Sequence, residues 1–319
     1  MNLRILDLDG SLIAQRGLLR LHPRACDVYD WGPRVRLACG FGRFERFERT
    51  LADRLGGPVD NAPWVTLYGS GDFHHVSLAL LRRQAQPFNL LVLDNHPDWM
   101  RGLPFLHCGT WLYHATRLPQ LCQIFHVGGD VDFDNAFRWM APWPALREGR
   151  ITVFPAVRRF RGGRWWKIPH EPLRPHADTS LSAERLEELL RPHRLQLARW
   201  PLYVSLDKDV MTQTDAVVNW DSGHLRLAEV ATVLTYFTEA ARGNLLGMDV
   251  VGDWSPVQVQ GAFRWLFHWT EHPPLAIDPV EACQRNEATN LALLRDGASG
   301  GRSHEGASAR AELPISRVA

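Results

Sequence analysis

The sequence predicts an α/β fold in which helices cover a mainly parallel, doubly wound sheet. Short apolar runs typical of buried strands alternate with segments of helical periodicity through most of the chain. One such alternation, a strand at 65–68, a helix from Val76 and a strand at 90–93, fits a βαβ unit, which requires a parallel sheet. The 319 residues are enough to bury one large core.

Each element is predicted from its own pattern. An alternating strand is expected at 3–8, and an amphipathic helix at 43–55 stops at Gly56-Gly57-Pro58. Beyond the βαβ unit the predicted elements are a helix at 110–118, strands at 122–127 and 151–154, a helix at 182–190, a strand at 202–206, a helix at 228–241, a strand at 245–251 and a helix at 278–294. Residues 295–319 contain few apolar side chains and are expected to form a disordered tail.

Composition restricts the function classes. A net charge of +1 gives no electrostatic basis for binding nucleic acid or a membrane surface. The first residues lack the apolar segment of a secretory signal, and no apolar run reaches the length of a membrane span. Five widely spaced cysteines without a C-x-x-C pair indicate a reducing compartment and neither a zinc ribbon nor a disulfide framework. We therefore expect a cytoplasmic protein that acts on a small molecule.

The most informative segment begins where the predicted strand at 90–93 ends. Asp94, His96 and Asp98 alternate there, and on an extended backbone alternate side chains point to the same face. Two carboxylates and an imidazole suit a hard or borderline divalent cation such as Mn²⁺ rather than a metal that prefers thiolates. Taken alone, the segment is equally compatible with a strand end whose polar side chains make turn hydrogen bonds, with Pro97 ending the strand.

Similar polar clusters follow other predicted strands: His74 with His75, Asp207 with Asp209, and Asp249 with Asp253. Sites in a parallel α/β sheet form at the carboxyl ends of strands, so these side chains are expected to meet. Six donors that include shared carboxylates are what a two-metal site requires. The candidate ligands are one of His74 and His75, together with Asp94, His96, Asp98, Asp207 and Asp209. Of the remaining histidines, His126 at a predicted strand end is the strongest further candidate.

The motifs and their order resemble the ureohydrolase superfamily of arginases, agmatinases and formiminoglutamases. The segment Gly71–Ser77 aligns with G-G-D-H-S-I-T, Asp94–Asp98 with D-A-H-x-D, and Ser205–Asp209 with S-x-D-x-D. Weaker similarity at 107–111, 223–229 and 247–251 extends the resemblance to roughly residues 60–290, and leaves the first 60 residues unexplained. The resemblance implies a three-layer α/β/α, arginase-like domain over residues 1–294, two Mn²⁺ ions, and a homo-oligomer such as a trimer or hexamer.

The resemblance also implies roles for the ligands. His74, Asp94, Asp98 and Asp207 would hold one Mn²⁺, and Asp94, His96, Asp207 and Asp209 the other. Two divalent cations can lower the pKa of a water between them from 15.7 to about 7–9, which gives hydroxide near neutral pH. Attack on a guanidinium, amidine or amide carbon would follow, with Asp98 or His107 assisting proton transfer to the leaving nitrogen. The implied activity is hydrolysis of a non-peptide C–N bond.

The expected substrate pocket departs from that pattern. Where relatives place a glutamate that grips the guanidinium, this chain has Gly252, and Asp253 follows one residue later. Cys108 occupies the place of the histidine in S-H-G-T, and the loop at 210–222 carries Asn219 instead of the arginase residues. We expect Asp253, Asn219 and His75 to bind substrate in a rebuilt pocket beside a preserved metal centre, which argues against arginase activity itself.

Two other functions fit part of the sequence. The segment Leu6–Ser11 resembles the nucleophile motif of haloacid-dehalogenase-type phosphatases, with Asp7 as the nucleophile, and residues 129–134 fit their acidic motif. That reading lacks the expected lysine before the acidic motif and gives the other carboxylates no role, so strand-end hydrogen bonds are preferred for Asp7 and Asp9. The second alternative is an arginase-like protein that binds without turnover, which the missing glutamate motivates.

Overall fold

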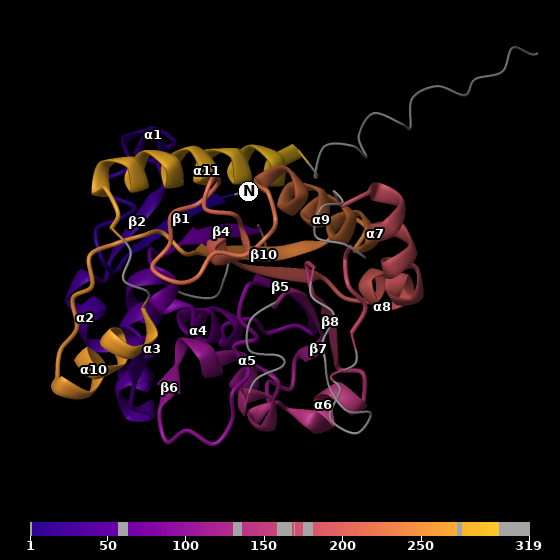
Figure 1. Ribbon diagram of the computed structural model, residues 1–319, viewed down its shortest axis with the longest axis horizontal. Helices are drawn as coiled ribbons and strands as arrows, with labels where there is room; N and C mark the ends of the chain where they lie inside the picture. Colours follow the sequence, from indigo (N-terminus) through magenta and orange to yellow (C-terminus); the bar gives the residue numbers. More distant parts are fainter. Residues whose placement is uncertain are drawn as a thin grey trace, which may run out of the picture.

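The computed structural model describes residues 2–56, 63–129, 136–157, 168, 170–174, 181–272 and 276–299. An eight-stranded sheet in the order β2-β1-β4-β10-β9-β5-β7-β8 forms its centre, and every neighbouring pair is parallel. Helices α1, α9 and α11 cover one face and α3, α4 and α5 the other (Figure 1). The predicted three-layer α/β/α fold with a parallel sheet is therefore confirmed.

The strands of the large sheet after residue 60 lie where the apolar runs predicted them. The strands of the large sheet are β1 (Asn2–Asp7), β2 (Arg24–Asp27), β4 (Trp64–Leu67), β5 (Phe88–Asp94), β7 (Leu121–Gly128), β8 (Ile151–Phe154), β9 (Leu202–Asp207) and β10 (Leu245–Val251). A separate antiparallel pair joins β3 (Ala38–Cys39) to β6 (Leu106–His107). Every residue of β5 is buried, as expected for a central parallel strand with helices on both faces.

The helices are α1 (Arg16–Leu19), α2 (Gly32–Val35), α3 (Phe41–Leu55), α4 (Val76–Arg82), α5 (Trp111–Ala115), α6 (Trp143–Arg147), α7 (Ala183–Leu190), α8 (Arg194–Arg199), α9 (Leu227–Ala240), α10 (Ala262–Glu271) and α11 (Pro279–Ser299). Helix α11 continues past Leu294, where the sequence prediction ended it, and the rest of the predicted tail, 300–319, lies outside the described residues. None of the helices in the described ranges is long and apolar enough to cross a membrane.

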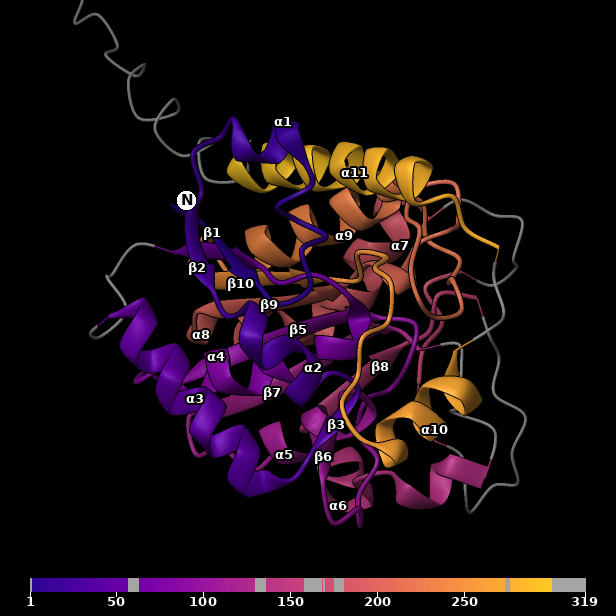
Figure 2. The ribbon, with the colours of Figure 1, turned by 90° about the vertical axis from the view of Figure 1, so that its left-hand side faces the viewer.

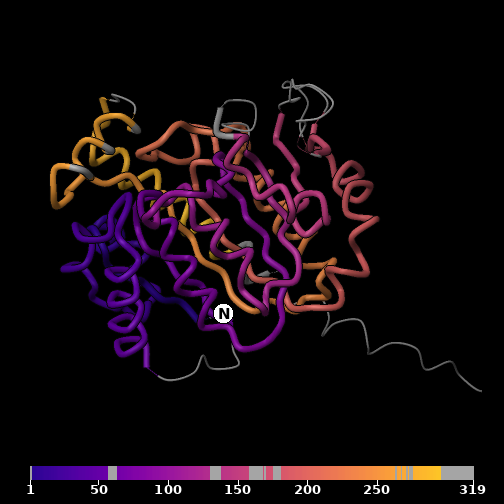
Figure 3. The backbone as a smooth tube through the Cα atoms, turned by 90° about the horizontal axis from the view of Figure 1, so that it is seen from below, coloured from indigo at the N-terminus to yellow at the C-terminus, as the bar shows by residue number. Residues whose placement is uncertain are grey.

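Residues 2–56 extend the sheet and cover part of one face. Strand β1 pairs with β4 and carries β2 on its outer side, while Phe44 and Phe47 of α3 join the core on the α4 side. Figures 2 and 3 show this N-terminal part, in indigo, gathered at one side of the molecule. The segment that the motif resemblance did not explain is thus an integral part of the sheet and its core.

The order of the strands brings distant segments together. The chain passes from β4 to β5, and β10 and β9 later fill the space between these two strands. Because all four strands are parallel, their carboxyl ends lie at one edge of the sheet. The residues that follow β4, β5, β9 and β10 therefore meet there.

Candidate metal centre

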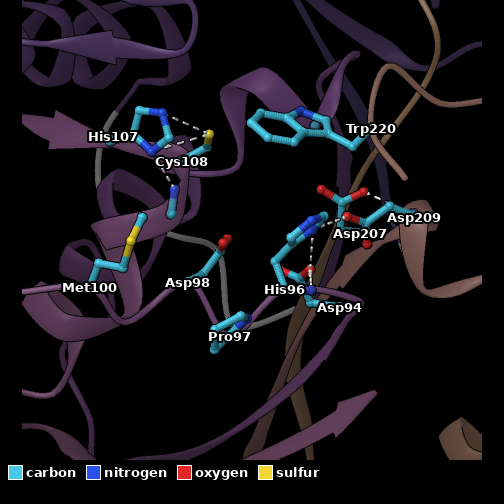
Figure 4. Close-up of a pocket in the computed structure, with 12 residues that line it drawn as sticks. Asp94, His96, Pro97, Asp98, Met100, His107, Cys108, Asp207, Asp209 and Trp220 are labelled. Atoms are coloured by element: carbon cyan, nitrogen blue, oxygen red, sulfur yellow. Dashed lines mark hydrogen bonds and ion pairs between the residues drawn. The ribbon is translucent and has the colours of Figure 1, made fainter. Parts of the chain in front are cut away.

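Asp94 and Asp207 lie side by side because they end neighbouring strands in register. Leu93 of β5 pairs with Leu206 of β9, and each aspartate is the next residue along its strand. His74 precedes α4, after the short 3-10 helix Gly71–Phe73 that follows β4. Figure 4 shows the aspartates at 94, 207 and 209 with His96 on one side of the pocket. Three segments far apart in the sequence thus contribute to one cluster.

The segment after Asp94 is not the extended strand that the alternation predicted. Strand β5 ends at Asp94, the chain bends at Asn95 and His96, and Asp98 has a φ of 50°. A positive φ is uncommon for a residue other than glycine and is found at sites where function constrains the backbone. A turn, and not an extended strand, therefore brings Asp94, His96 and Asp98 into one region. His96 faces Asp209, whereas Asp98 faces His74.

The first group of donors consists of His74, Asp94 and Asp98. The Nδ1 atom of His74 lies 3.0 Å from Asp94 Oδ2 and 3.0 Å from Asp98 Oδ2. Asp207 Oδ2 lies 3.6 Å from the same nitrogen. The side chains are almost fully buried, and neither His74 Nδ1 nor Asp94 Oδ2 makes a well-directed hydrogen bond. Donor atoms that converge in this way without pairing to each other suit a shared cation.

The second group shares Asp94 and adds His96 and Asp209. The Nδ1 atom of His96 lies 2.7 Å from Asp209 Oδ2 and 3.8 Å from Asp94 Oδ1. Donor atoms of Asp94, His96 and Asp209 lie within 4.8 Å of one another, as do those of His74, Asp94 and Asp98. Asp207 Oδ1 accepts the backbone N–H of Asp209 at 3.0 Å, which fixes the two carboxylates relative to each other. Two adjacent groups with one common carboxylate are the geometry that two cations would need.

The electrostatics of the buried carboxylates also favours a cation bound among the donor groups. Burial raises the pKa of Asp207 well above its usual range, and Asp209 adds to this effect. Burial, together with Asp94, raises the pKa of Asp209 to about 6. Burial opposes protonation of His96, but the neighbouring carboxylates outweigh it and raise its pKa to about 10. Divalent cations would stabilise the ionised carboxylates and keep the imidazoles neutral, so the donor set fits them.

A second layer of hydrogen bonds orients the donors. Ser205 Oγ lies 3.0 Å from His74 Nε2 and donates to Asp249 Oδ1 at 2.8 Å. Such a contact fixes which nitrogen a metal-binding histidine presents. Trp111 Nε1 donates to Asp98 Oδ2 at 2.7 Å. The sequence carried a signal for both residues, since Ser205 begins the S-x-D-x-D match and Trp111 ends the 107–111 match.

His126, the further ligand candidate from the sequence, contacts the backbone of His96. Its Nε2 lies 2.9 Å from the backbone carbonyl of His96, and its side chain is fully buried. Burial lowers the pKa of His126 to about 4, so its ring is neutral and the nitrogen facing that carbonyl carries the proton. This side chain supports the turn that carries His96 and is not one of the converging donors.

A pocket opens directly onto the donor groups. It holds about 490 Å³ of empty space when its open mouth is included. Besides four of the aspartates and His96, the described residues that line it are Gly71, Pro97, Met100, His107, Cys108, Gly109 and Trp220. Figure 4 shows Met100, His107 and Cys108 opposite the carboxylates, and Trp220 beside His96.

His107 is held in one orientation. Its Nδ1 accepts the backbone N–H of Gly109 at 2.9 Å, which places the proton of the neutral ring on Nε2. Burial lowers the pKa of His107 to about 4. The side chain therefore reaches the pocket as a neutral imidazole.

The structure places Asp253 away from the pocket lining, contrary to the sequence expectation. Its Oδ2 is 2.8 Å from Lys208 Nζ, and both side chains are buried. Its Oδ1 accepts hydrogen bonds from Gln15 at 2.6 Å and Asn290 at 3.2 Å. The carboxylate therefore joins the loop after β9 to α1 and α11, and it is occupied by protein partners.

Asn219 and His75 also point elsewhere. Asn219 Oδ1 accepts from Ser70 Oγ at 2.9 Å, and its Nδ2 donates to the Ser255 carbonyl at 2.9 Å, so the amide ties two loops together. His75 is fully buried, with its ring 5.9 Å from that of Phe44, and burial lowers its pKa to about 3. Neither residue is among the described residues that line the pocket. Hydrogen bonds to the neighbouring loops hold Asn219, and packing in the core holds His75.

The aspartates of the phosphatase-like motif make local hydrogen bonds. Asp7 Oδ1 accepts the N–H of Gly10 at 2.9 Å, and Asp9 Oδ1 accepts the N–H and hydroxyl of Ser11 at 3.1 and 2.7 Å. Asp9 Oδ2 also accepts from Ser255 Oγ at 2.7 Å. These contacts agree with the strand-end role preferred from the sequence. The acidic motif at 130–134 lies outside the described residues.

Comparison of the sequence with known proteins finds a distant relative. No family model matches the chain. A protein of Thermotoga maritima described as uncharacterized is 25% identical over 216 residues, which is 68% of this chain. The matched part spans 65% of that protein, slightly less than two thirds of its length.

Solved structures give a clearer result for the fold. The agmatine ureohydrolase of Thermoplasma volcanium matches 95% of this chain and 92% of its own, with a TM-score of 0.52 and 13% identity. Proclavaminate amidino hydrolase from Streptomyces clavuligerus matches 94% of this chain and 92% of its own, with a TM-score of 0.50 and 16% identity. An arginase from Bacillus cereus matches 93% and 98%, with a TM-score of 0.50 and 11% identity. The chain has the arginase-like fold, and the resemblance to the ureohydrolase superfamily is confirmed at the level of the fold.

Proposed function

We propose that this chain, which has the fold of the ureohydrolases, is a divergent member of that superfamily that hydrolyses a non-peptide C–N bond with two divalent cations, most readily Mn²⁺. The observation that carries the proposal is the pair of donor groups joined by Asp94 at the floor of a small-molecule pocket. Oxygen and imidazole donors without a thiolate suit Mn²⁺ better than a soft metal.

The proposed ligands are His74, Asp94, His96, Asp98, Asp207 and Asp209. When bound, two such cations supply a water of lowered pKa and offset negative charge that develops on the substrate. His107 is proposed as the catalytic residue that gives a hydrogen bond to the leaving nitrogen, because its ring is neutral and its Nδ1 is already occupied by Gly109. Asp98, held by the indole N–H of Trp111, is proposed as the second proton-transfer group.

The setting of the protein is proposed on other grounds. A reducing, cytoplasmic compartment is proposed because the five cysteines are widely spaced and form no C-x-x-C pair. A homo-oligomer, trimer or hexamer, follows from the resemblance, and light scattering of the purified protein measures it.

The test is metal content together with hydrolysis in matched variants. We expect the chelated and Mn²⁺-reloaded protein to bind two ions per chain and to release amine, ammonia or urea from a panel of guanidino, amidino and acyl-amine compounds. Asp207→Asn should lose at least one ion and roughly 100-fold or more in rate, since the ligand itself is changed. The exposed Asp53→Asn on α3 serves as the control with the same chemical change. Unaltered metal content in Asp207→Asn would refute the assignment, and metal without any hydrolysis would favour a binding protein.

A further inference from the structure

The end of β10 has no space for the glutamate side chain that the ureohydrolase pattern implies at this position. Gly252 occupies that position, with a φ of 97°. A Cβ atom added there would lie 2.4 Å from Asp207 Oδ1 and 2.7 Å from the backbone nitrogen of Lys208. The backbone is fixed as well, because the N–H groups of Gly252 and Asp253 both donate to the carbonyl of Gly69, at 2.8 and 2.9 Å. The glutamate is therefore excluded by packing and not merely replaced.

The carboxylate next in sequence cannot substitute for it. Asp253 is paired with the buried ammonium group of Lys208 and accepts hydrogen bonds from Gln15 and Asn290. Turning it towards the pocket would leave Lys208, which is 0% exposed, as a buried charge without its partner. Asp253 is thus unavailable as a counter-ion for a substrate cation.

The other buried carboxylates around the cluster are also engaged. Asp72 Oδ2 accepts from Arg36 Nε at 2.6 Å, and its Oδ1 lies 2.7 Å from His272 Nε2 and 2.9 Å from Trp220 Nε1. Asp249 Oδ1 accepts hydrogen bonds from three hydroxyl groups, those of Tyr68, Ser77 and Ser205. Both carboxylates are fully buried and turned into the protein.

Apart from the donor groups, the described lining of the pocket is largely apolar. Met100, Pro97, Cys108 and Trp220 contribute to it, and His107 is neutral. Within the described part of the chain, the carboxylates that line the pocket are Asp94, Asp98, Asp207 and Asp209, all of them proposed metal ligands. Four negative charges balance two divalent cations, so no described carboxylate remains for a cationic substrate group.

We infer that the group hydrolysed at this site is uncharged, an acylated amine of the type R–CO–NH–R′ with an apolar R or R′, and not a guanidinium. The inference rests on the proposed function, and it adds the substrate class. In the reaction, oxygen from water bonds to the acyl carbon and the C–N bond breaks. The products are R–COO⁻ and R′–NH₃⁺; the amine keeps the amide proton and takes both protons of the water. A guanidinium would lose its hydration in this pocket without gaining a counter-ion, whereas an amide has no charge to lose.

The test compares two compounds that share an alkyl chain and differ in charge at the reacting group, N-butylacetamide and butylguanidine. On the Mn²⁺-loaded protein we expect N-butylacetamide to bind at least 10-fold more tightly in calorimetry and to give the higher kcat/KM. Equal or tighter binding of butylguanidine, urea release as the faster reaction, or binding of neither compound overturns the inference. Absence of bound metal refutes the proposed function instead. If metal binds without any turnover, hydrolysis is refuted, and the binding comparison still decides which class of compound the site accepts.

A pair of variants at Met100 makes the charge argument specific. Met100→Glu places a carboxylate on the apolar wall, and Met100→Gln is its uncharged control of equal size. We expect Met100→Glu to bind butylguanidine about 10-fold more tightly than Met100→Gln does, with little change for N-butylacetamide. Identical guanidine binding by the two variants overturns the claim that a missing counter-ion sets the preference.

Discussion

Replacing Gly252 with alanine tests whether the end of β10 must lack a side chain for Asp207 to keep its position. The new methyl group would meet a carboxylate oxygen at 2.4 Å and the backbone nitrogen of Lys208 at 2.7 Å. Atoms at such distances must move apart. The backbone nitrogen lies between Asp207, the last residue of β9, and Asp209. The movement would therefore displace both of these proposed ligands.

The expected loss of unfolding free energy in Gly252→Ala has two parts. A φ of 97° is strained for any residue with a Cβ atom, which costs about 1–2 kcal/mol. Overpacking against a fixed neighbour adds about 1–3 kcal/mol. Gly243→Ala is the matched control, because Gly243 has a φ of 70° but no atom within 4 Å of the added Cβ. We therefore expect Gly243→Ala to lose only the part of the unfolding free energy that comes from backbone strain.

The assay combines urea unfolding of the two metal-free variants with Mn²⁺ content after reloading. Gly252→Ala should lose about 2–5 kcal/mol of unfolding free energy and much of its metal. Gly243→Ala should lose about 1–2 kcal/mol and keep the wild-type metal content. Equal stability losses in the two variants, with metal retained in both, would show that Gly252 does not constrain Asp207.

Further predictions follow from the buried contacts. Lys208→Met leaves Asp253 as an unpaired buried charge and should cost about 3–5 kcal/mol in urea unfolding, and adding Asp253→Asn should recover at least half of it; a double variant as unstable as the single one contradicts the ion pair. Trp111→Phe removes the indole donor and should weaken Mn²⁺ binding about 10-fold in a metal titration, so unchanged affinity would deny it that role. Because burial lowers the pKa of His107 to about 4 from 6.5, its stabilising effect is full above pH 6.5 and is lost as the pH falls towards 4. The metal-free protein should therefore lose about 3 kcal/mol more than His107→Gln does over that range, and parallel pH profiles would argue against it.

Much of the fold could be predicted because its strands are central and parallel. The apolar run at 90–93 predicts a strand that is buried on both faces, and β5 is indeed buried at every residue. Strand β2 was missed because Arg24–Asp27 lies at the edge of the sheet and is mostly exposed, so its sequence shows no apolar run. Helix α10 was also missed, since its outer face carries exposed Trp265 and Trp269 and its apolar residues do not mark one buried side.

The convergence of the donor groups could be anticipated because each group follows a predicted strand of one parallel sheet, whereas the pocket could not. Asp94 and Asp207 follow strands whose register is set by apolar runs. The position of Asp253 depends on contacts with Gln15 and Asn290, which come from opposite ends of the chain. No local pattern in the sequence predicts that the Asp253 carboxylate faces Lys208 and not the pocket.

Anomalous diffraction from crystals grown with Mn²⁺ tests the central claim most directly. The account predicts two peaks at the manganese absorption edge, one among His74, Asp94 and Asp98 and the other among Asp94, His96 and Asp209. In crystals of Asp94→Asn both peaks should weaken together, because the two groups share that carboxylate. A single peak elsewhere on the chain, or no peak at millimolar Mn²⁺, would contradict the account.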